Sequence, residues 1–278
     1  SNYLEPYIRD GARSLEGIEK TLSTLRGLSA PEAQTPTKEQ PTFVLVAGPN
    51  GAGKSTLSAS ETFKDFKIID PDAIARQQGL TGTEAPLNAF KEAVRQQQTL
   101  LSKGESFVTE TTLAATNGIR LLEQAKEAGF KTELHFVGLK DVSQSHERVA
   151  DRVKTGGHNI PAETLDERFP KVLKNLPEAI SAADKTVLYD NSGQESHRQV
   201  AELTREKSTF ERDTPKWAAS AALNAAILDQ QRATNDQASV QATHRAYDAA
   251  RAAGISDEQI KQINQETVQR QAEQVRQT

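Results

Sequence analysis

The chain has 278 residues, of which 36% are hydrophobic and 26% are charged, and its net charge is −4. This length is enough for one large or two modest domains. The acidic balance argues against a dedicated nucleic-acid-binding protein, which would carry a basic excess. The chain contains no cysteine, which excludes disulfides and thiolate metal sites. No apolar run reaches the about 18 residues that a transmembrane helix needs, and no secretory signal is visible, so we expect a cytoplasmic protein without a membrane partner.

The first 40 residues are expected to form a helix followed by a linker. Apolar residues recur at helical spacing between Leu4 and Leu25. The stretch from Ser29 to Pro41 contains three prolines and many polar side chains, which is typical of a linker. We therefore expect a first segment at residues 1–40.

Residues 41–208 alternate between short apolar runs and helical patterns. Strand-helix alternation of this kind predicts an α/β, three-layer fold like that of the P-loop nucleotide kinases, with a parallel five-stranded sheet covered on both faces. Helical patterns lie between the runs, at 87–101 and 119–128. The five expected strands are Phe43–Ala47, Phe66–Ile69, Ser106–Thr109, Glu133–Val137 and Thr186–Tyr189.

The last part of the chain, residues 209–278, is predicted to be a helical extension rich in alanine and glutamine. Gly254 is expected to end one helix, and Ser256-Asp-Glu-Gln259 has the pattern of a capping box that opens the next. This extension could pack on the preceding domain, pair with a partner, or form a solvated and partly frayed appendage.

A phosphate-binding motif follows the first expected strand. The stretch Gly48-Pro-Asn-Gly-Ala-Gly-Lys-Ser55 matches G-x-x-x-x-G-K-[ST] between a strand and a helix, which is the P-loop context. Glycines let backbone N–H groups surround phosphates, and the following helix directs its positive end at the same anion. Lys54 is predicted to reach the β- and γ-phosphates of ATP or GTP, and Ser55 to bind Mg²⁺. The candidate nucleotide-binding residues are Gly48, Asn50, Gly51, Ala52, Gly53, Lys54, Ser55 and Thr56.

Acidic residues follow the next two strands. Ligands of parallel sheets bind beyond the carboxyl ends of the strands, so Asp70 and Asp72 should lie beside the P-loop. One could orient Mg²⁺, and the other could accept a proton from an attacking hydroxyl. Glu110 and Thr112 follow the third strand and could bind sugar or nucleoside hydroxyls. The alternatives are that Asp72, or Thr111 or Thr112, only caps a helix.

An arginine-rich segment is predicted to form a lid. Arg148 and Arg152 are four residues apart and share a helix face, which Gly156 and Gly157 would end before a mobile loop. Arginines on such a lid would stabilise the transferring phosphoryl group, and Arg168 beyond it could contribute. The alternative is ordinary surface ion pairing with neighbouring acids.

The region from Thr42 to Gly193 resembles the zeta toxin family of P-loop kinases. The motifs that carry this resemblance are Ala47-Gly-Pro-Asn-Gly-Ala-Gly-Lys-Ser-Thr56, Ile69-Asp-Pro-Asp72, Thr109-Glu-Thr-Thr112, Phe136-Val-Gly-Leu139, Arg148-Val-x-x-Arg-Val-x-x-Gly-Gly-His158-x-Ile-Pro161, Asn175-Leu and Tyr189-Asp-Asn-Ser192. The resemblance implies a nucleotide-kinase fold, ATP with Mg²⁺, and transfer of phosphate to a hydroxyl of UDP-N-acetylglucosamine. It also implies a small helical antitoxin as partner.

Carried across by motif, the family roles suggest an assignment for each candidate. Asp72 resembles the base that takes the acceptor proton, and Glu110 and Thr112 resemble acceptor contacts. Arg148 resembles the phosphate-stabilising arginine of the lid, with Arg152 or Arg168 as the second. His158 is included as a candidate acceptor contact, although a structural role in its loop is the alternative.

Two other functions remain open at this level. The same fold could act on an antibiotic, a nucleotide or NAD. Alternatively, the protein is an interaction module rather than an enzyme: its helical extension binds a partner, and the P-loop only senses nucleotide.

Overall fold

The computed structural model describes residues 39–79, 84–157, 159–232, 237–263 and 265–266. The chain divides into two compact units, Ser1–Glu39 and Gln40–Thr278, and the described structure lies almost entirely in the second. The helix expected between Leu4 and Leu25 lies outside the described residues.

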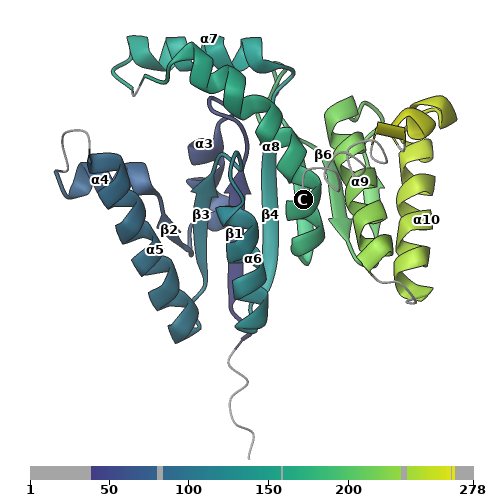
Figure 1. Ribbon diagram of the computed structural model, residues 1–278, viewed down its shortest axis with the longest axis horizontal. Coiled ribbons are helices and arrows are strands. Elements are labelled where there is room, and N and C mark those ends of the chain that lie inside the picture. Colours follow the sequence, from purple (N-terminus) through teal and green to yellow (C-terminus); the bar gives the residue numbers. More distant parts are fainter. Residues whose placement is uncertain (1–38, 80–83, 158, 233–236, 264, 267–278) are drawn as a thin grey trace, which may run out of the picture. The chain divides into compact units, whose positions relative to one another are not determined.

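A seven-stranded sheet forms the centre of this unit, with the strand order β2-β3-β1-β4-β5-β6-β7 (Figure 1). The first five strands in this order are parallel. They are β1 (Thr42–Ala47), β2 (Lys67–Ile69), β3 (Phe107–Thr111), β4 (Lys131–Gly138) and β5 (Lys185–Asp190).

Both faces of the sheet are buried, as the uninterrupted apolar sequence of β1 predicts. Phe43 and Leu45 belong to one hydrophobic cluster, while Val44 and Val46 belong to a second one. Successive side chains of a strand point to opposite faces, so each cluster covers one side of the sheet. The predicted α/β three-layer fold is therefore confirmed.

The prediction of five strands is incomplete. Two antiparallel strands, β6 (Arg198–Thr204) and β7 (Ser208–Phe210), extend the sheet beyond β5. Their sequences explain the omission, because β7 has three residues and the apolar residues of β6 are interrupted by Glu202. A short connection, residues 191–197, joins β5 to β6 and lies at the carboxyl end of β5.

Helices pack on the sheet and on one another. The long helix α8 was not expected, because Pro170 and Pro177 lie inside it and proline removes a helical hydrogen bond. The helices are α3 (Lys54–Ser58), α4 (Pro71–Gln77), α5 (Ala85–Lys103), α6 (Asn117–Glu127), α7 (Val142–Lys154), α8 (Ala162–Ala182), α9 (Lys216–Arg232) and α10 (Gln237–Ala252), with a 3₁₀ turn at Glu61–Phe63.

The alanine-rich helix α9 contributes to the main core. Ala218, Ala221 and Ala222 are buried in the same hydrophobic cluster as the central strands. Helix α9 contacts α8, β6 and α10, and Figure 1 shows it beside β6. Small side chains let this helix approach its neighbours closely, which is why a weakly hydrophobic sequence can still be buried.

The predicted capping box after α10 is confirmed. The Ser256 backbone N–H donates to Gln259 Oε1 at 2.8 Å, and the Gln259 backbone N–H donates to Ser256 Oγ at 3.2 Å. Gly254, with a φ of 89°, follows the end of α10 as expected. In the part of the chain that the structure describes, no helix is both long enough and apolar enough to cross a membrane.

Candidate active site

The P-loop, Gly48 to Ser55, connects β1 to α3 as predicted. Side chains from helix α7 hold it from one side. Ser145 Oγ donates to the Asn50 carbonyl at 2.6 Å, and Arg148 Nη1 donates to the Gly51 carbonyl at 3.4 Å. Two carbonyl groups near the tip of the loop are therefore hydrogen-bonded from outside.

Lys54 is half-buried and folds back over the loop. Its ammonium group donates to the Gly48 carbonyl at 2.9 Å and to the Pro49 carbonyl at 3.0 Å. Burial lowers the pKa of Lys54 to about 8; the carboxylate of Glu110 opposes this shift and the guanidinium of Arg152 adds to it. A bound polyphosphate would favour the charged form of this lysine.

Glu110 connects the P-loop to the neighbouring strand. It lies near the end of β3, opposite Val46 of β1. Ser55 Oγ donates to Glu110 Oε2 at 2.9 Å, and the hydroxyl of Ser58 donates to the other carboxylate oxygen. Glu110 is also one of the residues that line a cavity beside β3, so it borders both regions.

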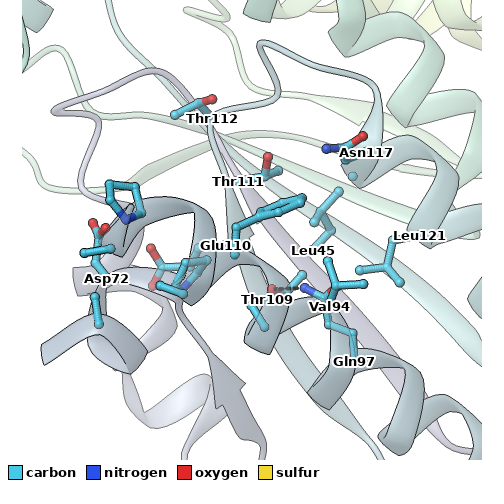
Figure 2. Close-up of a pocket in the computed structure, with 18 of the residues that line it drawn as sticks. Leu45, Asp72, Val94, Gln97, Thr109, Glu110, Thr111, Thr112, Asn117 and Leu121 are labelled. Carbon is cyan, nitrogen blue, oxygen red and sulfur yellow. Dashed lines mark hydrogen bonds between the residues drawn. The ribbon is translucent and has the colours of Figure 1, made fainter. Parts of the chain in front are cut away.

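That cavity, here called the acceptor cavity, has a volume of about 1130 Å³. It opens between α4, α5, β3 and α6, and Figure 2 shows Asp72, Glu110 and the threonines after it around this space. Its polar and charged side chains are Asp72, Arg76, Gln97, Gln98, Thr109, Glu110, Thr111, Thr112, Asn117, Arg120, Gln124 and Arg168.

The two aspartates after β2 have different positions. Asp70 is the N-cap of α4, and its Oδ1 accepts from the Asp72 backbone N–H at 2.9 Å. The alternative that Asp72 caps this helix is therefore wrong. Asp72 lies in the first turn of α4, is exposed, and lines the acceptor cavity.

Thr111, the last residue of β3, and Thr112, which follows it, do not cap a helix either. Thr111 Oγ1 accepts from the Leu113 backbone N–H at 3.1 Å, and Thr112 Oγ1 accepts from that of Ala114 at 3.4 Å. Helix α6 begins later, after its N-cap Thr116. Thr111 and Thr112 thus shape the turn that follows β3, at the rim of the cavity.

Arg148 and Arg152 both lie on α7 but have different surroundings. The guanidinium of Arg148 reaches the P-loop carbonyl of Gly51, and its Nη2 donates to the carbonyl of Asn191. Arg148 is therefore bound to backbone carbonyls, which differs from the surface ion pair considered as an alternative.

Arg152 is the arginine of α7 whose charge affects Lys54. Its side chain passes over Gly157, where an added Cβ would lie 2.4 Å from Arg152 Cγ. The second glycine of the pair thus leaves room for this arginine. Arg168, on α8, lines the acceptor cavity instead. His158 lies outside the described residues, although its neighbours Gly156 and Gly157 line the cavity.

The oxygen atoms around Ser55 fit Mg²⁺. Among the described residues, no three His, Cys, Asp or Glu side chains gather as a metal-binding group. Mg²⁺ is commonly held by one or two carboxylates together with substrate phosphates and water. The Ser55 hydroxyl and the adjacent Glu110 carboxylate provide hard oxygen ligands of this kind.

Sequence reasoning missed several residues of this region. Ser145 begins the arginine-rich segment and Asn191 lies within Tyr189-Asp-Asn-Ser192, but neither received a role. His197 belongs to no motif. Arg76 and Arg120 lie on helices that follow strands, which is the signal that could have identified them as cavity residues.

Comparisons with known proteins agree with this architecture. The zeta toxin family model matches residues 83–202, a range that contains Glu110, Arg148 and Arg152. An uncharacterized protein of Haemophilus influenzae is 31% identical over 127 residues, which are 45% of this chain and 91% of that protein.

Solved structures are similar at the level of the fold. The crystal structure of AvrRxo1-ORF1:-ORF2 with ATP has 16% sequence identity and a TM-score of 0.52, covering 76% of each chain. A structure of the PezAT chromosomal toxin-antitoxin system of Streptococcus pneumoniae has 17% identity and a TM-score of 0.49, covering 85% of this chain and 95% of that chain. Taken with the P-loop, the parallel sheet and the arginine helix, the family match leads to one conclusion: this chain belongs to the zeta toxin family of P-loop kinases.

Proposed function

We propose that this protein is an ATP-dependent kinase that transfers the γ-phosphate to a hydroxyl of a UDP-amino sugar, similar to UDP-N-acetylglucosamine, and that it is the toxin of a toxin-antitoxin pair. The observation that carries the proposal is the hydrogen bond between Ser55 and Glu110. Because Glu110 also lines the acceptor cavity, a second substrate bound there would lie beside the phosphates of ATP.

The donor half of the reaction follows from the P-loop. Its backbone N–H groups and Lys54 would bind the phosphates, and Arg152 would approach them as α7 closes. Mg²⁺ bound near Ser55 and Glu110 would neutralise charge on the β- and γ-phosphates.

The acceptor half depends on Asp72. Its exposed carboxylate lines the cavity, and Asp70 rather than Asp72 makes the helix cap. Asp72 is therefore free of that structural task and suited to accept the proton of the attacking hydroxyl. Thr112 and Glu110 would position that hydroxyl, so that oxygen and γ-phosphate meet in line.

The walls of the cavity favour an acceptor with a ring and an anionic group. Three arginines, Arg76, Arg120 and Arg168, line it against two carboxylates. Phe90, whose side chain is 44% exposed, provides an aromatic surface on α5. A nucleotide sugar offers both a planar base and a diphosphate, whereas a polycationic antibiotic would be repelled by the arginines.

A second candidate retains the fold and changes the acceptor. A nucleotide or NAD satisfies the same requirement for a ring and phosphate, and the observation that favours it is the same set of arginines. For the partner, the family resemblance supports a small helical antitoxin. The fold-level similarity to AvrRxo1-ORF1:-ORF2 with ATP supports ATP as the donor.

The direct experiment incubates the purified protein with γ-labelled ATP, Mg²⁺ and separate acceptors: UDP-sugars, nucleotides, NAD and an aminoglycoside. Labelled UDP-N-acetylglucosamine is the expected product, with Lys54→Met as the inactive control. Transfer to another acceptor would replace the UDP-sugar assignment. Absence of transfer to every acceptor, while ATP still binds, would favour the nucleotide-sensing interaction module instead.

A further inference from the structure

The connection between β5 and β6 also contacts the P-loop, at different carbonyl groups from those that α7 contacts. Asn191 begins this connection and is 8% exposed. Its Nδ2 donates to the Ala52 carbonyl at 2.8 Å, across 139 residues of sequence. Its backbone N–H donates to the Gly138 carbonyl at 3.0 Å, which fixes the residue at the end of β4.

His197 closes the same connection and reaches the next P-loop carbonyl. Its Nε2 lies 2.9 Å from the Gly53 carbonyl oxygen, which can only accept a hydrogen bond. Nε2 must therefore carry the proton, and Nδ1 lies 2.8 Å from the Ser196 hydroxyl. The backbone of His197 has a φ of 52°, a left-handed conformation that is uncommon outside glycine but enriched in Asn, Asp and His.

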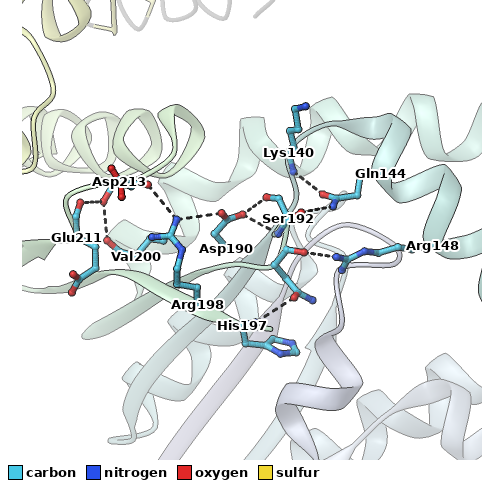
Figure 3. A network of polar contacts seen from close by, with 12 residues as sticks. Lys140, Gln144, Arg148, Asp190, Ser192, His197, Arg198, Val200, Glu211 and Asp213 are labelled. Atoms are coloured by element: carbon cyan, nitrogen blue, oxygen red, sulfur yellow. Dashed lines mark hydrogen bonds and ion pairs between the residues drawn. The ribbon is translucent and has the colours of Figure 1, made fainter. Parts of the chain in front are cut away.

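Asn191 and His197 also support each other, and we call this pair the β5–β6 clamp. The His197 backbone N–H donates to Asn191 Oδ1 at 3.2 Å, so both polar atoms of the asparagine side chain are occupied. Arg148, which Figure 3 shows near Ser192 and His197, donates to the carbonyl of Asn191. The same guanidinium also reaches the carbonyl of Gly51. The clamp is thereby connected to the lid helix α7.

The geometry of the peptide bond gives these contacts their consequence. In a trans peptide, the carbonyl of one residue and the N–H of the next point in opposite directions. The hydrogen bond from Asn191 holds the Ala52 carbonyl toward the clamp, so the Gly53 N–H points away from it. The contact with His197 holds the Gly53 carbonyl in the same way, so the Lys54 N–H also points away from the clamp. Backbone N–H groups that converge in this way form the concave surface that binds phosphate.

Gly53 fits the clamp because it has no side chain. A Cβ added to Gly53 would lie 2.9 Å from Asn191 Nδ2 and 3.0 Å from His197 Nε2. The glycine of the motif and the two clamp residues therefore pack against one another, although they are far apart in sequence.

From these contacts we propose that Asn191 and His197 are positioning residues that hold the P-loop N–H groups toward the phosphates of the bound nucleotide. The proposal goes beyond the proposed function, because it concerns the binding of a triphosphate and does not depend on the acceptor. Neither residue needs to touch the reacting atoms.

The test measures binding of ATP by calorimetry in four matched variants. Asn191→Asp keeps the size of the side chain and the oxygen that accepts from the His197 backbone N–H. It loses the N–H group that donates to the Ala52 carbonyl. His197→Asn suits the left-handed backbone but is too short to reach Gly53, whereas His197→Gln has an amide that can donate at that distance. Gln194→Ala, at an exposed residue of the same connection, is the control.

Asn191→Asp and His197→Asn should each weaken ATP binding about tenfold, which corresponds to the loss of one hydrogen bond of ordinary net strength. The affinity of His197→Gln for ATP should stay within about threefold of the wild-type value. The affinity of Gln194→Ala should equal that of wild type. The two variants of His197 should have the same thermal unfolding temperature. Both should fold as wild type does, and they differ only in whether the side chain at residue 197 is long enough to reach the Gly53 carbonyl.

The proposal is overturned if His197→Asn and His197→Gln bind ATP equally well, or if Asn191→Asp binds like wild type. It is also overturned if weaker binding follows the unfolding temperature, which would indicate a general structural role. A protein that binds ATP through the clamp but phosphorylates no acceptor would contradict the proposed function and leave this inference supported.

Discussion

The P-loop and the acceptor cavity meet at Glu110 but are held in different ways. Carbonyl groups of the P-loop are hydrogen-bonded by side chains from α7 and from the β5–β6 connection. The cavity is instead lined by side chains from several helices, and Asp72, Phe90 and Arg120 among them are exposed. The proposed donor site is thus defined by backbone groups that side chains hold, while the proposed acceptor site is defined by the side chains themselves.

Replacing the proposed base, Asp72, should have the largest effect, because it should slow phosphate transfer without weakening ATP binding. Asp72→Asn should lower the rate of phosphate transfer about 10³-fold, since the carboxylate that accepts the proton is lost. ATP binding should remain within about twofold of wild type, because Asp72 does not contact the P-loop carbonyls. Single-turnover transfer and calorimetry give the two values. Asp65→Asn, an exposed aspartate near β2, is the control and should retain full activity.

Adding a methyl group to the P-loop should break the donor half. Gly53 has a φ of 94°, and its Cβ would displace the clamp. Left-handed strain and loss of clamp contacts together should weaken ATP binding about 100-fold in Gly53→Ala. Gly193→Ala is the matched control, because nothing lies within 4 Å of its added Cβ. Equal ATP affinity in the two variants would contradict the close fit between Gly53 and the clamp.

The pH dependence of ATP binding should report on Lys54. Its pKa of about 8 in the free protein means that the ammonium form, which binds phosphate, is lost as the pH rises through 8. The dissociation constant should therefore rise toward about tenfold per pH unit above 8, and binding near pH 8 should take up about half a proton. Calorimetry in two buffers of different ionisation enthalpy measures this uptake. A dissociation constant that is flat between pH 7 and 9.5 would disagree with the lowered pKa.

A change on the acceptor wall should have the smallest effect and leave the donor half intact. Phe90→Ala should raise the KM for the acceptor about threefold by removing an aromatic surface, with the KM for ATP unchanged. Leu87→Ala is the control, because Leu87 is 53% exposed on the same helix but does not line the cavity. If both variants behave alike, Phe90 does not contact the acceptor.

The sequence predicted the donor side more completely than the acceptor side, for physical reasons. The P-loop and the five parallel strands are local patterns: a glycine-rich motif and buried apolar runs. By contrast, β6 and β7 are short, and the prolines of α8 obscure its helical pattern.

Contacts between distant residues could not be predicted from spacing. His197 and Gly53 are 144 residues apart, and the strand order alone brings them together. The shared helix face of Arg148 and Arg152 was predictable, but the contact of Arg148 with the Asn191 carbonyl was not. The helix cap after β2 was placed on the wrong aspartate as an alternative, because Asp70 and Asp72 are both compatible with that sequence position.

In the proposed function, Glu110 joins the donor and acceptor halves into one site. The most direct test is the steady-state kinetics of Glu110→Gln, with Glu105→Gln, an exposed residue before β3, as control. Glu110→Gln should raise both the Mg²⁺ concentration needed for half-maximal rate and the KM for the acceptor, each by at least about fivefold, because Glu110 accepts from Ser55 and also lines the cavity. If neither value changes, or if one changes alone, Glu110 does not link the two halves.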